Sequence, residues 1–260
     1  MSAKSKVLVT GASSGIGAVY ADRFARRGHD LVLVARDAAR LDRLAERLRR
    51  ETGVGVEVLR ADLTKRGDVA RVEAKLADDA AIDILINNAG AAAWGGFLDH
   101  GADAAADLIA LNVTALTRLA AAVAPRLVAA GRGAIVNIGS VVGLAPEMGM
   151  TVYGATKAYV NFLSQGLARE LADKGVYVQA VLPAATRTEI WGRAGVDVEQ
   201  IPGVMEVGEL VDAALVGFDR REAVSIPPLP DAGQWEAYEA ARTAMIPNFR
   251  QPHPAARYLG

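Results

Sequence analysis

Short apolar runs alternate with longer helical patterns along most of the 260-residue chain. The runs have the length of buried strands, and most precede a segment whose apolar residues recur every three or four positions. Short connections between such segments predict a parallel sheet covered by helices on both faces. We therefore expect an α/β fold of one domain, residues 1–260, built on a doubly wound Rossmann sheet of seven mostly parallel strands. The expected strands are residues 7–9, 31–35, 54–59, 82–86, 134–138, 176–182 and 223–226.

A glycine-rich turn follows the first expected strand, and a helical pattern begins directly after it. Glycines allow the backbone to approach a ligand closely, and a helix N-terminus presents free N–H groups to phosphate. Strand, glycine-rich turn and helix in this order predict a site for a dinucleotide pyrophosphate; a turn that merely connects two elements is the alternative. The residues assigned to this site are Gly11, Ser13, Ser14, Gly15, Ile16 and Gly17.

Two charged residues, Arg36 and Asp37, follow the second expected strand. In a dinucleotide fold this position lies beside the adenosine ribose. Arg36 comes first and could pair with the 2′-phosphate of NADP, which favours NADPH as the cofactor over NAD. Asp37 would instead bind the ribose hydroxyls of NAD if the strand ended one residue later. A third interpretation leaves both side chains in solvent.

Further polar or small residues follow the third, fourth and sixth expected strands. Asp62 is placed to hydrogen-bond an adenine amino group, or else to cap the next helix. The amide of Asn88 can tie neighbouring strands together, and the small residues after it leave room for a cofactor. The hydroxyls after the sixth strand lie beside the expected nicotinamide. The residues assigned to the cofactor from these segments are Asp62, Leu63, Asn88, Ala89, Gly90, Pro183, Thr186 and Thr188.

Tyr153 and Lys157 are four residues apart, so they lie one turn from each other on one face of a helix. Ser140 follows the fifth expected strand, and its hydroxyl can meet the phenol if the strand end faces that helix. A lysine ammonium beside a phenol lowers the pKa of the phenol, which then serves as general acid or base. Taken alone, the pair is more often a tyrosine packed on a lysine stem at a helix surface.

Asn112 interrupts an apolar helical stretch that extends from about residue 102 to residue 130. A buried asparagine usually has a hydrogen-bonding reason to be there. It either satisfies a local carbonyl or holds a water that passes protons to Lys157.

Taken together, these motifs resemble the single-domain short-chain dehydrogenase/reductase family. The resemblance covers roughly residues 6–188 and depends on the motifs occurring in order on the expected elements. It implies that Tyr153 donates or accepts the substrate proton, Ser140 orients the substrate oxygen, and Lys157 binds the nicotinamide ribose. Lys157 also lowers the pKa of Tyr153, and Asn112 completes a proton relay. The remaining matches, Gly11, Gly15, Gly17, Asp62 and Asn88-Ala89-Gly90, are implied to line the cofactor.

One position departs from the family pattern. Members of the family usually carry Pro-Gly after the sixth strand, where this chain has Pro183-Ala184. Alanine disfavours a positive φ, so the departure puts the geometry of this loop in doubt and leaves the catalytic set unaffected. Arg36 resembles the NADP-preferring members.

The bulk composition excludes several kinds of protein. With 29 basic and 30 acidic residues the charge is balanced, so we expect no nucleic-acid surface. Cysteine is absent and the three histidines are scattered, so we expect neither disulfides nor a metal site. We expect no membrane partner, because charged residues and Pro125 interrupt the longest apolar stretch, residues 116–130. The N-terminus lacks the apolar region of a signal peptide, and we expect a cytoplasmic protein.

Two segments are expected to border the site. Residues 190–206 contain several glycines and a proline and are interpreted as a substrate lid. Residues 227–260 form a C-terminal extension, placed either over the site or at a subunit interface. The family resemblance favours a homodimer or homotetramer. The residues considered for an apolar substrate wall, with core or subunit contacts as the alternative, are Trp94, Phe97, Met148, Met150 and Trp191.

The sequence thus predicts an NAD(P)-dependent oxidoreductase that interconverts a small-molecule carbonyl and an alcohol, in the manner of a carbonyl reductase or alcohol dehydrogenase. The main alternative is an NADP-binding sensor or interaction protein with the same fold and no turnover. Epimerisation or dehydration at the same site is a third interpretation.

Overall fold

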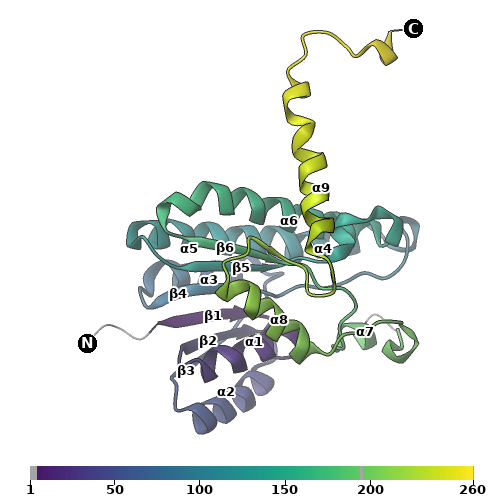
Figure 1. Ribbon diagram of the computed structural model, residues 1–260. Coiled ribbons are helices and arrows are strands. Elements are labelled where there is room, and N and C mark those ends of the chain that lie inside the picture. The colour runs from purple at the N-terminus through teal and green to yellow at the C-terminus, as the bar shows by residue number, and fades with distance from the viewer. Residues whose placement is uncertain (1–4, 194–195, 260) are drawn as a thin grey trace. The chain divides into compact units, whose positions relative to one another are not determined.

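The computed structural model describes residues 5–193 and 196–259. The chain divides into two compact units, Met1–Pro227 and Pro228–Gly260. The first unit contains the complete sheet, and Figure 1 shows its strands stacked between layers of helices. Residues 194 and 195, which belong to the predicted lid, lie outside the described residues.

The sheet has seven strands in the order β3-β2-β1-β4-β5-β6-β7, and all neighbours pair in parallel. The predicted doubly wound sheet is therefore confirmed. The chain runs outward from β1 to β3, returns to the middle of the sheet at β4, and runs outward again to β7. The strands are β1 (Lys6–Thr10), β2 (Asp30–Ala35), β3 (Val56–Arg60), β4 (Ile82–Asn87), β5 (Ala134–Ile138), β6 (Tyr177–Val181) and β7 (Val224–Ser225).

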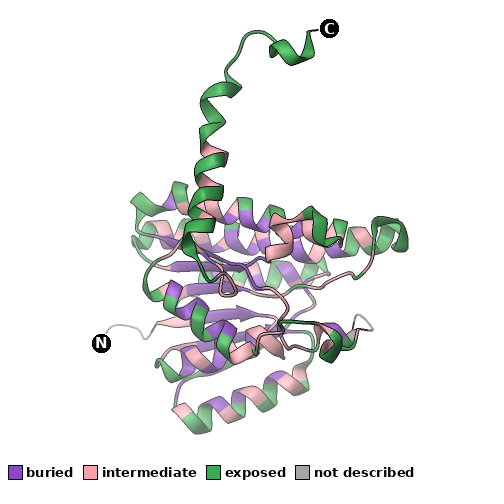
Figure 2. Ribbon diagram, turned by 45° about the vertical axis from the view of Figure 1, so that its right-hand side comes forward, coloured by how far each residue is buried: buried purple, intermediate pink, exposed green. Residues whose placement is uncertain are grey.

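Helices cover both faces of the sheet and bury its apolar side chains in two separate cores. One core joins β1 and β2 to α1, α2 and α8, through residues such as Phe24, Leu41 and Val211. The other core lies against α3, α5 and α6 and includes Val72 and Leu119. Figure 2 shows the strands buried between these layers. The helices of the first unit are α1 (Gly15–Arg26), α2 (Ala38–Thr52), α3 (Arg66–Asp78), α4 (Ala102–Ile109), α5 (Leu116–Ala130), α6 (Thr151–Leu171), α7 (Ile190–Arg193) and α8 (Val207–Asp219).

A π-helical turn, Ala110–Ala115, joins α4 to α5. The continuous helical segment Ala102–Ala130 is long and apolar enough to cross a membrane by length and composition. The expectation that charged residues and Pro125 leave no apolar stretch of that length is therefore wrong, because the helix is continuous from Ala102 to Ala130. Length and composition are weak evidence for a membrane span, since a core helix passes the same test. Leu116, Leu119 and Val123 are buried in this segment.

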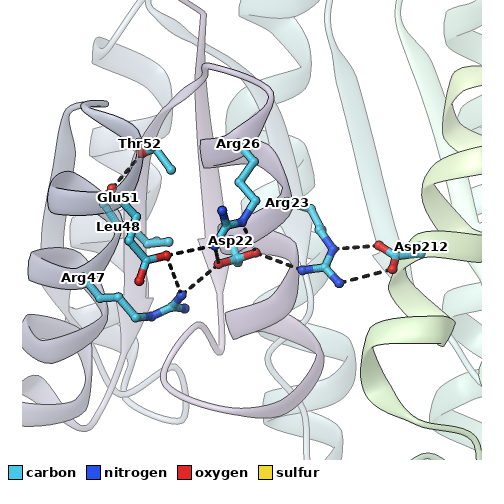
Figure 3. A network of polar contacts seen from close by, with 8 residues as sticks. All are labelled: Asp22, Arg23, Arg26, Arg47, Leu48, Glu51, Thr52 and Asp212. Atoms are coloured by element: carbon cyan, nitrogen blue, oxygen red, sulfur yellow. Dashed lines mark hydrogen bonds and ion pairs between the residues drawn. The ribbon is translucent and has the colours of Figure 1, made fainter.

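A charged cluster on the outer side of α1 fastens three helices together. The carboxylate of Asp22 accepts hydrogen bonds from the guanidinium groups of Arg23, Arg26 and Arg47. Arg23 also pairs with Asp212 of α8 at 2.7 Å, as Figure 3 shows. Although burial favours its neutral form, the hydrogen bonds from the arginines lower the pKa of Asp22. The cluster therefore joins α1 to α2 and α8 with a carboxylate that stays charged at neutral pH.

The C-terminal unit consists of α9 (Ala232–Ala244) and short helical turns after it. The carboxylate of Asp231 caps the helix by accepting a hydrogen bond from the Gly233 N–H at 2.8 Å. Trp235 and Tyr238 stack with their ring centroids 5.2 Å apart, and no residue of this helix is buried. The role predicted for residues 227–260, over the site or at a subunit interface, stays a prediction.

Candidate active site

The carboxyl ends of β1, β2, β4, β5 and β6 open into one cavity of about 1220 Å³. Every cofactor and catalytic residue predicted from the sequence lines this cavity, except Gly17 and Asn112. The lining residues among those predicted are Gly11, Ser13, Ser14, Gly15, Ile16, Arg36, Asp62, Leu63, Asn88, Ala89, Gly90, Ser140, Tyr153, Lys157, Pro183, Thr186 and Thr188.

The glycine-rich turn forms a cradle at the cavity end of β1. Gly11 and Gly15 have φ values of +66° and +54°, which side chains rarely adopt. The next helix begins at Gly15, and the Ser14 side chain makes no capping bond to it. The first N–H groups of α1 are therefore available to an anion in the cavity. Gly17 has a packing role instead, because a Cβ there would come within 2.4 Å of the Asn88 amide nitrogen.

Thr10 and Asn88 fasten this turn to the end of β4. The Thr10 hydroxyl accepts hydrogen bonds from the backbone N–H groups of Asn88 and Ala89 at 2.9 and 3.0 Å. The amide of Asn88 donates to the carbonyl oxygen of Thr10 at 2.9 Å. Asn87 similarly donates to the amide oxygen of Asn137 on β5. The amides after β4 thus tie neighbouring strands, as the sequence predicted.

The charged side chains after β2 have different surroundings. Asp37 caps α2, because its carboxylate accepts a hydrogen bond from the backbone N–H of Arg40 at 3.0 Å. Arg36 is exposed at the rim of the same cavity. Asp62, across from them, accepts hydrogen bonds from the N–H and hydroxyl of Thr64 at 3.0 and 2.8 Å. Asp62 therefore closes a local turn, and the predicted alternative that it caps the next helix is wrong, since α3 begins after Lys65.

Ser140 stands at the end of β5, where it is buried and bonded to the backbone. Its hydroxyl accepts a hydrogen bond from the Val142 N–H at 3.2 Å and donates to the Pro183 carbonyl at 3.3 Å. The same hydroxyl is within hydrogen-bonding reach of the Tyr153 phenol. The predicted convergence of Ser140, Tyr153 and Lys157 is present, because all three line the cavity.

Burial sets the protonation of Tyr153 and Lys157. It raises the pKa of the Tyr153 phenol to about 12, and a hydrogen bond with the Ser140 hydroxyl opposes the rise. Burial also lowers the pKa of the Lys157 ammonium to about 8. Lys157 donates to the Ile138 carbonyl at 2.8 Å, and its nitrogen lies 5.6 Å from the centroid of the Tyr153 ring. The net pKa shift of Tyr153 is thus upward, opposite to the lowering expected from Lys157 alone.

Asn112 is buried in the π-helical turn and holds the loop after β4. Its amide nitrogen donates to the Ala91 carbonyl at 2.9 Å and to the Thr156 hydroxyl at 3.1 Å. Its oxygen accepts from the Ala91 N–H at 3.0 Å. A Cβ on Gly90 would lie 3.2 Å from that oxygen and 3.8 Å from the Lys157 nitrogen, so both side chains border Gly90. A π-helical turn within a longer helix often marks a functional site.

The segment after β6 has an ordinary backbone despite the alanine at position 184. Among the described residues other than glycine, only Met150 and Arg221 have a positive φ, so Ala184 fits this loop without strain. Thr186 is buried, and Thr188 approaches the glycine turn: a Cβ on Gly15 would lie 3.2 Å from its methyl group. The doubt raised by the missing glycine is therefore resolved.

The other end of the cavity is apolar and aromatic. Trp94 and Trp191 meet edge to face with ring centroids 4.8 Å apart, and the indole N–H of Trp191 donates to the Thr186 carbonyl at 2.6 Å. Met148 and Met150 complete this wall, which we call the substrate end together with the two tryptophans. Phe97 was expected there as well but is 63% exposed and lies outside the lining.

The family model for short chain dehydrogenases matches residues 5–198. The chain belongs to this family. It is 68% identical to a solved short-chain dehydrogenase from Sphingobium yanoikuyae in complex with NADPH, with a TM-score of 0.96 over 98% of this chain and 99% of that one. It is 57% identical to a bulky-bulky ketone specific alcohol dehydrogenase from Comamonas testosteroni, with a TM-score of 0.93 over the full length of both chains.

Among curated proteins, this short-chain dehydrogenase is 35% identical over 187 residues to very-long-chain 3-oxoacyl-CoA reductase-A of Danio rerio. That match covers 70% of the chain and 58% of the relative, so the chain spans somewhat more than half the length of this relative.

Three polar residues of this short-chain dehydrogenase line the cavity without having been singled out from the sequence: Arg40, Thr64 and Glu189. Arg40 lies in the first turn of α2, three residues after Asp37, and no sequence motif had indicated it. Glu189 directly follows Thr188, but its position depends on how the segment after β6 folds, which no local pattern predicts. Among the described residues, no group of three or more acidic or histidine side chains is placed to hold a metal ion.

Proposed function

We propose that this protein is an NADPH-dependent carbonyl reductase that interconverts a bulky ketone and its secondary alcohol. The observation that carries the proposal is the convergence of Ser140, Tyr153 and Lys157 beside a cavity that can hold a dinucleotide. The cofactor supplies the hydride to the carbonyl carbon. The side chains described above supply the proton and hold the substrate oxygen.

Tyr153 is the proton donor in the direction of reduction. With a pKa raised to about 12, its phenol is protonated at neutral pH and can deliver the proton to the developing alkoxide. The Ser140 hydroxyl accepts from the Val142 N–H and, by turning its hydrogen from the Pro183 carbonyl, can donate to the substrate oxygen and hold it. The Lys157 ammonium can then pass a proton to the Tyr153 phenolate and regain one from solvent, while Asn112 keeps the neighbouring loop in place.

Arg36 supports NADPH as the cofactor. The Asp37 carboxylate is engaged in capping α2, so the cation at the rim is the group best placed for the adenosine ribose. A guanidinium suits the 2′-phosphate, and the related dehydrogenase from Sphingobium yanoikuyae binds NADPH.

The charge distribution in the cavity supports a neutral, bulky substrate. Lys157 apart, the charged groups among the described lining residues follow β2, β3 and β6 and are Arg36, Asp37, Arg40, Asp62 and Glu189. The substrate end offers two indoles and two thioethers. A ketone with two large apolar substituents matches this end, and the related Comamonas testosteroni enzyme is specific for bulky-bulky ketones.

A sensor or interaction protein without turnover is the weaker alternative. Such a protein has no need of a buried phenol and a buried lysine at the end of a dinucleotide cavity. Burying the Lys157 ammonium opposes its charged form, which a purely structural position would avoid.

Replacement of Tyr153 by phenylalanine tests the proposal. We expect NADPH oxidation with aryl alkyl ketones to fall by about three orders of magnitude, because general acid catalysis contributes on that scale. NADPH binding, followed by quenching of tryptophan fluorescence, should be unchanged.

Tyr159→Phe is the matched control for that substitution. Tyr159 lies on the same helix, is 40% exposed, and shares a hydrogen bond with the Thr117 hydroxyl. This control should retain full activity. Near-normal turnover by Tyr153→Phe would contradict the proposed mechanism, and absence of NADPH binding by the unaltered protein would contradict the proposed cofactor.

We also propose a homodimer or homotetramer in the cytoplasm. Phe162 is 82% exposed on α6 and Ile109 is 45% exposed at the end of α4, which supports contacts between copies on this side of the sheet. Light scattering of the purified protein, and of a Phe162→Glu variant, measures the state of assembly.

A further inference from the structure

Arg40 of α2 and Glu189 of the segment after β6 form an ion pair inside the lining of the cavity. One guanidinium nitrogen lies 2.8 and 2.6 Å from the two carboxylate oxygens. A second nitrogen, Nε, lies 3.4 Å from the Asp37 carboxylate. Arg40 is therefore held at the start of its own helix and reaches from there to Glu189.

The strand order shows that this ion pair joins residues that follow widely separated strands. Between β2, which precedes Arg40, and β6, which precedes Glu189, lie β1, β4 and β5. Four strand spacings amount to roughly 19 Å. An ion pair between residues that follow β2 and β6 must therefore cross the carboxyl edge of the sheet, where a dinucleotide binds in this fold.

The segment that makes this crossing, Thr186–Trp191, is called the strap here. Its middle touches the glycine turn through Thr188 and Gly15, and its far end carries Trp191 against Trp94. Arg187 pairs with Glu206 at 2.7 Å and with Glu199, which ties the root of the strap to the following loop. The strap is thus anchored at its root and reaches α2 through Glu189.

We propose that Arg40 and Glu189 form a latch that closes the strap over the bound dinucleotide and slows its release. This inference rests on the proposed function, because it takes the cavity to be the NADPH site. Both side chains are partly exposed, 38% for Arg40 and 50% for Glu189. Exposed ion pairs are weak, so the contact can open at each turnover.

Arg40 and Glu189 are consequently positioning residues, neither of which touches the reacting atoms. Because Trp191 belongs to the strap, closing the latch also completes the aromatic wall of the substrate end. The ion pair thereby connects the adenosine side of the cavity to the substrate side.

Stopped-flow measurement of NADPH dissociation from the full-length protein tests the latch. Glu189→Gln should speed release by about two- to fivefold, the range expected for one exposed ion pair. Arg40→Met should speed it at least as much, and the double variant should release no faster than Arg40→Met. The exchanged pair, Arg40→Glu with Glu189→Arg, should recover part of the loss. Arg43→Met and Glu46→Gln, exposed positions of α2 outside the cavity lining, are the charge-matched controls.

A crosslink provides a second, independent test. The protein has no cysteine, so Arg40→Cys with Glu189→Cys introduces a unique thiol pair. A short bismaleimide should trap bound NADPH when it is added after the cofactor, and should prevent uptake when it is added before.

The outcomes separate the latch from the function. If the unaltered protein binds no NADPH, the proposed function fails together with the latch. If NADPH binds but the two single effects multiply in the double variant, or Glu189→Gln slows release, the latch alone is overturned. Exchange of NADPH at an unchanged rate in the crosslinked protein would also overturn it.

Discussion

The two ends of the cavity are built differently. At the cofactor end, polar side chains bond to the backbone of neighbouring strands: Thr10 and Asn88 join β1 to β4 through bonds of 2.9 to 3.0 Å. At the substrate end apolar side chains predominate: Trp94 meets Trp191 with ring centroids 4.8 Å apart, and one hydrogen bond holds the Trp191 indole to the Thr186 carbonyl. Hydrogen bonds to the backbone fix both distance and direction, whereas apolar contacts tolerate repacking.

This difference suggests a division of labour. The cofactor end must recognise one molecule with a constant shape, so a pre-formed polar frame serves it. If the protein reduces ketones with large substituents, as proposed above, apolar side chains on loops at the substrate end can adapt to them. Lys157 lies where the two ends meet. Changes at the cofactor end should therefore affect stability and NADPH binding together, and changes at the substrate end should affect substrate binding without affecting NADPH binding.

Replacing Lys157 by methionine should produce the largest effect on stability, with a distinctive pH dependence. Burial lowers the pKa of Lys157 from 10.5 to about 8, so between these values the unfolded chain holds a proton that the folded protein has released. Stability must therefore rise with pH through this window, by on the order of 3 kcal/mol at most. Below pH 8 the buried ammonium costs stability.

Urea unfolding at several pH values between about 8 and 9 measures this effect, below the pKa of about 10 at which tyrosines of the unfolded chain titrate. The difference in stability between the unaltered protein and Lys157→Met should shift in favour of the unaltered protein as the pH rises. A pH-independent difference would show that Lys157 keeps an ordinary pKa in the folded state.

Thr10→Val should have the second largest effect on stability, because it removes hydrogen bonds that join β1 to the end of β4 at the cofactor end. The substitution keeps the shape of the side chain but leaves the N–H groups of Asn88 and Ala89 without their acceptor. Buried donors without partners cost about 2 kcal/mol in total, and NADPH affinity should fall as well because both residues line the cavity.

Thr117→Val is the control, since Thr117 donates to the Val113 carbonyl and its other partner, the Tyr159 hydroxyl, is exposed enough to bond to water instead. Thermal unfolding and NADPH titration of both variants give the comparison. Equal losses of stability and of NADPH affinity in the two variants would mean that the Thr10 hydrogen bonds contribute no more than an ordinary threonine contact.

The same division explains what the sequence could predict. Ser140, Arg36 and the glycine turn follow directly after strands, so the order of strands was enough to bring them to one edge. The latch pair was missed because Glu189 reaches Arg40 only through the path of the strap across the sheet edge. The upward pKa shift of Tyr153 also depends on burial that no local motif encodes. Asn112 was predicted as a buried polar residue, but its bonds to Ala91 needed the π-helical turn.

Trp94→Ala should have a smaller effect that is confined to the substrate end. Loss of an edge-to-face contact and of one aromatic wall should raise the KM for aryl ketones about fivefold. KM for a small aliphatic ketone and affinity for NADPH should stay unchanged. Phe97→Ala serves as the control, because Phe97 is on the same loop but outside the cavity lining. An equal rise in KM for small and large ketones would mean that Trp94 positions the loop and does not contact the substrate.

Met150 allows the smallest and most local test of the substrate end. It precedes α6 with φ 56° and ψ 48°, a left-handed conformation that a side chain disfavours by about 1 kcal/mol or more. Met150→Ala removes the thioether and keeps the strain, whereas Met150→Gly removes both. The glycine variant should therefore be the more stable of the two by up to about 1 kcal/mol, since the greater flexibility of glycine in the unfolded chain offsets part of the gain. Urea unfolding of the two variants measures the difference.

Turnover of the same two variants shows whether Met150 also holds the Tyr153 phenol in place, because Tyr153 lies in the first turn after Met150. If it does, both variants should lose activity for large and small ketones alike. If Met150 only contacts the substrate, the loss of activity should be limited to large ketones.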